Sequence, residues 1–169
     1  SFDPPHIGHE HIVKKALELD SIDKVIIMPT FLNPFKSQSH APSELRLKWL
    51  RGIFGKEKNV EISSFEVNLK KKVPSIESVQ HLLHYYQKIY LIIGADNLEL
   101  LHKWERYREL KHLVTFVIAT RDNIIVPHNY LVLHIEENIS SSQLRERMDS
   151  AKLSNIYANQ IIKFYKENN

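Results

Sequence analysis

Two histidines near the start of the chain, His6 and His9, have the types and spacing needed to handle phosphate groups. They lie in the run Ser-Phe-Asp-Pro-Pro-His-Ile-Gly-His (residues 1–9), just before apolar residues that recur at helical spacing. The histidines therefore belong to the loop and first turn of a helix, where backbone N–H groups and the positive end of the helix dipole favour an anion. Gly8 would let a ligand or a neighbouring backbone approach closely. This pattern predicts a polyphosphate site.

Two other interpretations of these histidines remain open. Together with His11 they form a His-x-x-His-x-His cluster, and imidazoles bind zinc. The chain has no cysteine to accompany them, and His11 is rotated well away from His9 on a helix. They could also be ordinary helix-start residues that the backbone satisfies. We favour phosphate and expect no metal site built by the protein.

A second candidate anion site is the segment Ile-Ser-Ser-Ser-Gln-Leu-Arg at residues 139–145. Three hydroxyl groups and their N–H groups would lie at the start of a helix. Arg145 could hold a terminal phosphate through two parallel hydrogen bonds. Alone, such a segment is more often a capped surface helix than a nucleotide site.

Short apolar runs alternate with helical patterns, and this order predicts what positions the candidate sites. Strands are predicted at residues 24–28, 60–67, 89–93, 113–119 and 130–135. Besides the helix after His9, helices are predicted at residues 43–54, 75–87, 97–102, 106–111, 140–148 and 155–166, with Ser43 and Ser140 as caps. Apolar strands alternating with helices indicate an α/β protein whose parallel sheet is covered on both faces.

Ligands of such sheets bind beyond the carboxyl ends of the strands. Three candidate motifs follow strands: the opening loop, the turn Gly94-Ala95-Asp96, and the segment before Ser140. We therefore expect these motifs to converge in space although they are far apart in the sequence.

Composition limits the class of protein. The chain has 169 residues, enough for one domain with a core, and we expect residues 1–169 to form a single domain. It has no apolar run long enough to span a membrane and no cysteine, which suits a cytoplasmic enzyme. Its net charge of +3 suits a phosphorylated small molecule better than a nucleic acid. The sequence leaves open whether the chain forms a homo-oligomer.

Residues 1–9 resemble the opening signature of the nucleotidyltransferase superfamily. In nicotinate- and nicotinamide-nucleotide adenylyltransferases this signature commonly reads G-[ST]-F-D-P-P-H-x-G-H, and the chain matches it from Ser1 onward. Residues 139–145 resemble the I-S-S-T-x-[IL]-R signature of the same superfamily, with Ser142 where threonine is common. The two glycines and the strand that begin the first signature are expected upstream of Ser1, within about ten residues.

The resemblance implies a Rossmann-like, doubly wound fold and a reaction. The family transfers the adenylyl group of ATP to nicotinate mononucleotide, giving deamido-NAD and pyrophosphate in NAD biosynthesis, with Mg²⁺. It assigns catalysis to His6, His9 and Arg145. The implied ATP contacts are Ser1, Phe2, His6, Gly8, His9, Gly94, Asp96, Arg121, Ser141, Ser142 and Arg145.

The mononucleotide contacts are implied by three further segments. These contacts are Asn33, Lys36, Ser75, Ile76, Glu77 and Trp104. Asn-Pro-Phe-Lys at residues 33–36 resembles a phosphate-contacting loop, and Arg46 is a weaker candidate for the same phosphate. Trp104, after the Gly94–Asp96 turn, would stack on the pyridine ring, although it could equally be a core residue.

The segment Pro-Ser-Ile-Glu at residues 74–77 departs from the family's P-S-Y-T. A carboxylate of Glu77 that pointed toward the ligand would repel the nicotinate carboxylate, whereas one that pointed outward would complement the helix dipole. The backbone amides survive the change, so nicotinate stays favoured, and an enzyme that prefers nicotinamide mononucleotide is the alternative. Two further alternatives are a pantetheine-phosphate adenylyltransferase, which shares the fold, and an inactive nucleotide- or metal-binding module. Class I aminoacyl-tRNA synthetases share His-Ile-Gly-His, but they are much longer and carry a lysine-rich signature that this chain lacks.

Overall fold

The computed structural model describes residues 1–121, 124–136, 139–154 and 156–168. The chain forms two compact units. The first comprises Ser1–Val73 and Ile139–Asn169, so both ends of the chain contribute to it, and the second comprises Pro74–Asn138.

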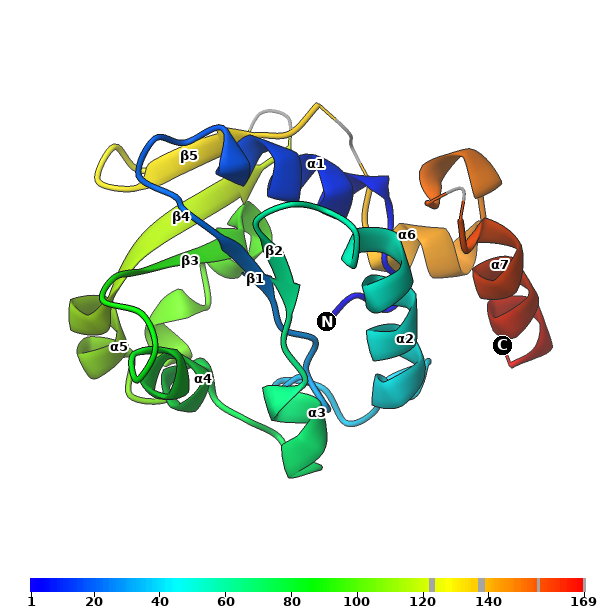
Figure 1. Ribbon diagram of the computed structural model, residues 1–169, viewed down its shortest axis with the longest axis horizontal. Coiled ribbons are helices and arrows are strands. Elements are labelled where there is room, and N and C mark those ends of the chain that lie inside the picture. Colours follow the sequence, from blue (N-terminus) through cyan, green and yellow to red (C-terminus); the bar gives the residue numbers. More distant parts are fainter. Residues whose placement is uncertain (122–123, 137–138, 155, 169) are drawn as a thin grey trace. The chain divides into compact units, whose positions relative to one another are not determined.

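The first unit contains a pair of parallel strands and most of the helices (Figure 1). Strand β1 (Val25–Ile27) pairs with β2 (Val60–Ile62), with Val25 opposite Val60. The helices are α1 (Ile7–Leu17), α2 (Ser43–Phe54), α3 (Phe65–Leu69), α6 (Ser141–Glu146), the 3₁₀ turn η3 (Ser150–Lys152) and α7 (Ala158–Glu167). The side chains of Trp49 on α2 and Tyr165 on α7 are each 1% exposed and belong to one apolar cluster. This cluster joins the C-terminal helices to α2.

The second unit is a three-stranded parallel sheet with helices packed on it (Figure 1). Its strands β3 (Ile89–Gly94), β4 (Val114–Thr120) and β5 (Leu131–His134) lie in that order. Its helices are α4 (Ser75–Leu82), the 3₁₀ turns η1 (Ala95–Asn97) and η2 (Leu101–Lys103), and α5 (Tyr107–Leu113). Ile76 and Val79 of α4 and Leu110 of α5 pack with β3 and β4 in one core. Apolar strands buried by helices account for the near-continuous hydrophobic runs in the sequence.

The predicted α/β class with parallel strands is confirmed, since every described strand pair is parallel. The strand predicted at residues 60–67 is wrong beyond Ile62. The chain turns there, because the Ser63 hydroxyl accepts the Phe65 N–H and the Ser64 carbonyl accepts the Asn68 N–H, which starts α3. The prediction was wrong because Phe65 and Val67, which lie in one turn of α3, alternate with polar residues as in a strand.

Several helix boundaries also differ from the predictions. Pro42, not Ser43, is the cap of α2, and the Ser43 hydroxyl donates instead to the Glu44 carboxylate at 2.8 Å. The helix predicted to reach residue 87 ends at Leu82, and the one predicted at residues 97–102 is a pair of 3₁₀ turns. Ser140 caps α6 as predicted, although α6 ends at Glu146. The last helix begins at Ala158, and its predicted first residue, Asn155, lies outside the described residues.

Within the described part of the chain, no helix combines the length and the apolar character that crossing a membrane requires.

Candidate active site

The two histidines of the opening loop are fixed by each other. His6 precedes α1 in an extended conformation, and its carbonyl accepts the His9 N–H at 2.9 Å. The His6 N–H in turn donates to Nδ1 of His9 at 3.1 Å, and the two rings stack with centroids 3.7 Å apart. Because Nδ1 of His9 accepts this hydrogen bond, the proton of the neutral ring lies on Nε2. His9 can therefore offer an N–H donor to an anion without first gaining a charge.

The ring of His9 also contacts Phe2. Their ring centroids are 4.7 Å apart at an interplanar angle of 54°, so His9 has aromatic neighbours in both Phe2 and His6. Phe2 has a left-handed backbone, with φ of 56°, which is uncommon for a bulky residue. The turn at Phe2 thus brings its ring back onto the helix, where it limits the orientations open to His9.

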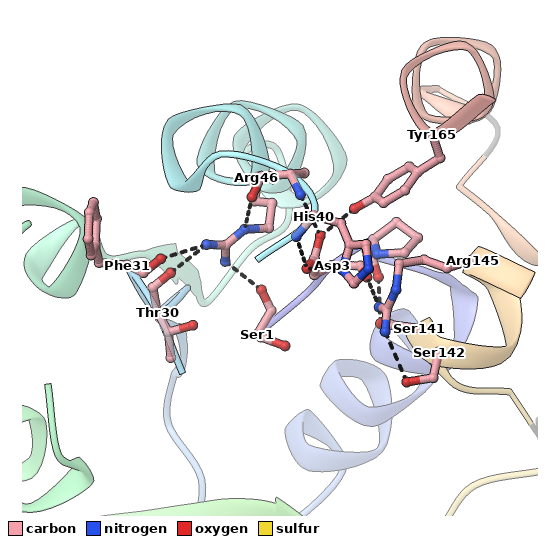
Figure 2. A network of polar contacts seen from close by, with 12 residues as sticks. Ser1, Asp3, Thr30, Phe31, His40, Arg46, Ser141, Ser142, Arg145 and Tyr165 are labelled. Atoms are coloured by element: carbon pink, nitrogen blue, oxygen red, sulfur yellow. Dashed lines mark hydrogen bonds and ion pairs between the residues drawn. The ribbon is translucent and has the colours of Figure 1, made fainter. Parts of the chain in front are cut away.

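The C-terminal motif is hydrogen-bonded to the opening loop (Figure 2). The Ser141 hydroxyl donates to the Pro4 carbonyl at 2.8 Å. The guanidinium of Arg145 donates to the Asp3 carbonyl through Nη1 and to the Ser142 hydroxyl at 3.1 Å through Nη2. The predicted convergence of the opening loop with the segment around Ser140 is confirmed.

Gly8 is required by the close approach of these two motifs. A Cβ atom at this position would lie 2.9 Å from Cγ2 of Ile139 and 3.0 Å from Nδ1 of His6. The first distance is shorter than real Cβ contacts and the second is tighter than most, so a larger residue at this position would force the side chains of Ile139 and His6 to shift. The neighbours of Gly8 are thus two side chains, those of Ile139 and His6, and not the backbone that was predicted.

The carboxylate of Asp3 is an internal hub of the loop, and its side chain is almost fully buried. It accepts hydrogen bonds from the backbone N–H groups of His40 and Ala41, each at 2.9 Å, and from the Tyr165 hydroxyl at 2.5 Å (Figure 2). Burial by itself would raise the pKa of Asp3, but these hydrogen bonds and the positive charge of Arg46 outweigh it, so the pKa lies below its ordinary value. Burial and the bond to Asp3 raise the pKa of Tyr165. Asp3 is therefore ionised and Tyr165 protonated at neutral pH.

Arg46 binds backbone carbonyls rather than a ligand, and its side chain is 0% exposed. The predicted role of Arg46 as a weaker phosphate contact is wrong, because its side chain is fully buried. Its guanidinium joins four points of the chain, as Figure 2 shows. The acceptors are the carbonyls of Ala41 at 3.0 Å, Ser1 at 2.7 Å, Thr30 at 2.8 Å and Phe31 at 3.0 Å.

The loop with the predicted mononucleotide contacts is folded on itself. The Asn33 side chain accepts the Phe35 N–H at 2.9 Å, and its carbonyl accepts the Lys36 N–H at 2.9 Å. Phe35 is 59% exposed at the tip of this turn. A short parallel bridge between Leu32 and Lys72 secures its base.

In the second unit, the turn after β3 has a close approach of its own. A Cβ atom at Gly94 would collide with Oδ1 of Asp96, so a larger residue would require this exposed side chain to turn away, although the φ of −69° suits any residue. The Asp96 carboxylate is exposed and accepts a hydrogen bond from Asn97 at 3.3 Å. Arg121 directly follows β4 and is half-buried.

The other candidates of the second unit differ in exposure. Ile76 is 0% exposed within the core, which leaves only its backbone for the predicted contact. Ser75 and Glu77 are half-buried in the first turn of α4, where the Glu77 N–H is bonded to the Pro74 carbonyl at 3.0 Å. Trp104 is half-buried and packs against the same core, so it has at least a structural role.

Asp3 and Tyr165 shape the site, but neither was predicted from the sequence to do so. Asp3 was visible as part of the opening motif, but it had no assigned partner. Nothing in the sequence pairs Tyr165 with a residue 162 positions earlier. Among the described residues, no three histidine, aspartate or glutamate side chains gather in a way that would hold a metal ion.

Comparison with known proteins identifies the family. Residues 1–147 match the family model described as cytidylyltransferase-like. A protein of Sulfurimonas denitrificans named probable nicotinate-nucleotide adenylyltransferase is 58% identical over 99% of this chain and 92% of its own length. A protein of Nitratiruptor with the same name is 49% identical over 98% of this chain and 95% of its own.

Solved structures show the same fold at low sequence identity. The nicotinic acid mononucleotide adenylyltransferase of Plasmodium falciparum, complexed with NaAD, matches all of this chain and 95% of its own with a TM-score of 0.76 and 19% identity. The protein thus has the Rossmann-like nucleotidyltransferase fold that the sequence predicted. Together with the identities above, this shows that the chain belongs to the cytidylyltransferase-like family and, within it, to the nicotinate-nucleotide adenylyltransferases.

Proposed function

We propose that this chain transfers the adenylyl group of ATP to nicotinate mononucleotide, giving deamido-NAD and pyrophosphate in NAD biosynthesis. The observation that carries this proposal is the hydrogen-bonded junction between the opening loop and the C-terminal motif. It holds the Arg145 guanidinium against the loop that bears both imidazoles. Full-length relatives that carry the name of this activity support it.

The reaction needs no nucleophile from the protein. An oxygen of the mononucleotide's 5′-phosphate forms a bond to the α-phosphorus of ATP, and the bond from that phosphorus to the pyrophosphate oxygen breaks. Catalysis then depends on positioning the reactants and stabilising the charge that moves onto pyrophosphate. In our proposal Nε2–H of His9, the His6 ring and Arg145 supply that stabilisation.

Arg145 is suited to a terminal phosphate because a guanidinium has five N–H groups. Two of its nitrogens bind the Asp3 carbonyl and the Ser142 hydroxyl, which sets the plane of the group. The remaining N–H groups could bind phosphate oxygens in a fixed orientation. Ser1, Phe2, Gly8, Ser141 and Ser142 complete the proposed ATP contacts of this unit.

For the other residues we propose the predicted roles. For the mononucleotide these are Asn33, Lys36, Ser75, Ile76, Glu77 and Trp104, and for ATP they are Gly94, Asp96 and Arg121. We take residues 1–169 as one nucleotidyltransferase domain.

Mg²⁺ fits the residues present. This ion is usually held by one or two carboxylates together with substrate phosphates, and Asp96 supplies an exposed carboxylate at the carboxyl end of β3. When bound with ATP, the ion would neutralise charge on the departing pyrophosphate.

The test is the release of pyrophosphate from ATP and Mg²⁺, with nicotinate mononucleotide, nicotinamide mononucleotide and phosphopantetheine compared side by side. We expect a strong preference for the nicotinate form, which would mean that Glu77 points away from the ligand carboxylate. Preference for nicotinamide would keep the chemistry and overturn the choice of base. Preference for phosphopantetheine, or no release with any of the three, would refute the proposal.

A further inference from the structure

Tyr165 lies far along the chain from the opening motif but contacts its most buried acid. It belongs to the last turns of α7, beyond the residues 1–147 that match the family model. Its ring is 1% exposed, and its hydroxyl donates to Oδ1 of Asp3 at 2.5 Å (Figure 2). Packing alone would be served equally well by phenylalanine, so the hydroxyl calls for its own explanation.

Asp3 holds two parts of the site in place, one through its carbonyl and one through its carboxylate. Its carbonyl accepts the Arg145 guanidinium, and its carboxylate accepts the N–H groups of His40 and Ala41. It also precedes His6 by only three residues. A shift of Asp3 therefore moves both the loop with the imidazoles and the carbonyl that orients Arg145.

We propose that Tyr165 is a positioning residue for the adenylyl transfer, which acts by holding the Asp3 carboxylate and, through it, the opening loop and Arg145. This inference rests on the proposed function. Tyr165 touches no substrate in this scheme. Its effect is on the alignment of the phosphate-binding groups, because misplacement of such groups by about 1 Å can lower turnover by as much as roughly 100-fold.

The ionised state of Asp3 is part of this arrangement. The groups that face it are the Tyr165 hydroxyl from α7, the His40 imidazole at 3.5 Å from Oδ2, Arg46 from α2 and, at its carbonyl, Arg145 from α6. The hydroxyl favours the carboxylate, since it donates to the charged form. Removing the hydroxyl should therefore raise the pKa of Asp3, so that its carboxylate becomes protonated at a higher pH.

The first experiment compares Tyr165→Phe with wild type and with Tyr157→Phe. The control removes one phenol hydroxyl at the cap of the same helix, from a residue that packs on the same cluster. For Tyr165→Phe we expect kcat to fall about tenfold while KM for ATP stays within about twofold, and the acid limb of the pH profile to move to higher pH. Tyr157→Phe should leave kcat, KM for ATP and the acid limb unchanged. A Tyr165→Phe enzyme with wild-type kcat and acid limb, and only a lower Tm, would reduce Tyr165 to packing and overturn the inference.

A second variant covers the case in which Tyr165→Phe does not fold. Replacing Tyr165 with 3-fluorotyrosine keeps the ring and makes the hydroxyl a stronger donor, so the acid limb should move to lower pH. An unmoved limb would contradict the proposal.

One readout does not depend on activity at all. The ¹⁵N signals of the His6 and His9 imidazoles should shift in Tyr165→Phe without substrate, because their loop moves. Unchanged signals would overturn the positioning role. By contrast, a wild-type protein that releases no pyrophosphate would refute the proposed function, and these signals would then still show whether Tyr165 holds the opening loop in place.

Discussion

At the scale of the residue, His9 is a hydrogen-bond donor whose orientation and tautomer are fixed by the opening loop. Its Nδ1 is engaged by the His6 N–H, and its ring lies against those of Phe2 and His6. The orientation and the tautomer are therefore set before a ligand binds. Such preorganised donors stabilise the charge of a transition state more than mobile donors do.

Replacing His9 with alanine should lower kcat by about 100-fold or more, as expected for the loss of one charge-stabilising donor. The measurement is steady-state pyrophosphate release at saturating ATP. His11→Ala is the matched control, since it removes an imidazole two residues along the same helix. Wild-type turnover in His9→Ala would exclude His9 from the phosphate site.

Arg145 combines a charge with a fixed plane, and two substitutions separate these properties. Arg145→Ala removes both and should mainly weaken ATP binding, by about tenfold or more in KM, as for the loss of a charged hydrogen bond. Arg145→Lys keeps the charge and should restore only part of the affinity, since an ammonium cannot reproduce the guanidinium fork. Unchanged ATP affinity in Arg145→Ala, measured by calorimetry, would remove Arg145 from the site.

At the scale of the element, Arg46 joins α2 to the loops around it. It is fully buried, and its hydrogen bonds satisfy carbonyls from three separate segments. Replacing it with methionine would leave these buried carbonyls without a donor, at a cost of about 1–3 kcal/mol for each that water cannot reach.

We therefore expect Arg46→Met to lower the free energy of unfolding in urea by about 3 kcal/mol or more. Arg51→Met, on the exposed side of the same helix, should change it by no more than about 0.5 kcal/mol. If the two variants were equally stable, the carbonyl network would have no role in holding the loops.

Several helices, strands and caps could be predicted from the sequence. The helix after His9, the strand before Gly94 and the Ser140 cap follow from local patterns, and all three are present. The short helix α3 was misread because its turn depends on two serine hydrogen bonds rather than on apolar spacing. The junction of the two motifs was predictable, since both resemble signatures of one superfamily.

The network under that junction was not predictable. Asp3, Arg46 and Tyr165 act through partners that are 5 to 162 residues away, and many of these partners are backbone groups, which have no signature in the sequence. Spacing rules describe neighbours on one helix or strand, and none of these contacts is of that kind. Arg46 therefore looked like a ligand contact, and no role was predicted for Tyr165.

At the scale of the whole molecule, the first unit is closed by contacts between the two ends of the chain. The C-terminal motif binds the opening loop through Ser141 and Arg145, and α7 reaches the same loop through Tyr165. Folding of this unit therefore requires contacts of very long sequence separation. Its stability should depend on the charge state of Asp3, on which several of these contacts meet.

The sign of this dependence follows from the pKa of Asp3. Because that pKa is lower in the folded protein than its ordinary value of 3.8, the unfolded chain binds more protons in acid. The stabilisation is complete above the unfolded pKa and is lost as the pH falls through the folded one. The pKa of Glu44 is also lowered, by hydrogen bonds at the start of α2, and it contributes with the same sign.

Asp3→Asn should isolate the contribution of Asp3. The carboxylate accepts hydrogen bonds with both oxygens, whereas the asparagine NH₂ group is itself a donor and would face other donors. The variant should therefore be less stable than wild type at pH 7. The difference between them should shrink as the pH falls below about 4, since wild type then loses its charge as well. Urea unfolding across a pH series measures both effects, with Asp20→Asn, an exposed aspartate, as the control. A difference that stayed constant with pH would mean that the shape of Asp3, and not its charge, holds the two ends of the chain together.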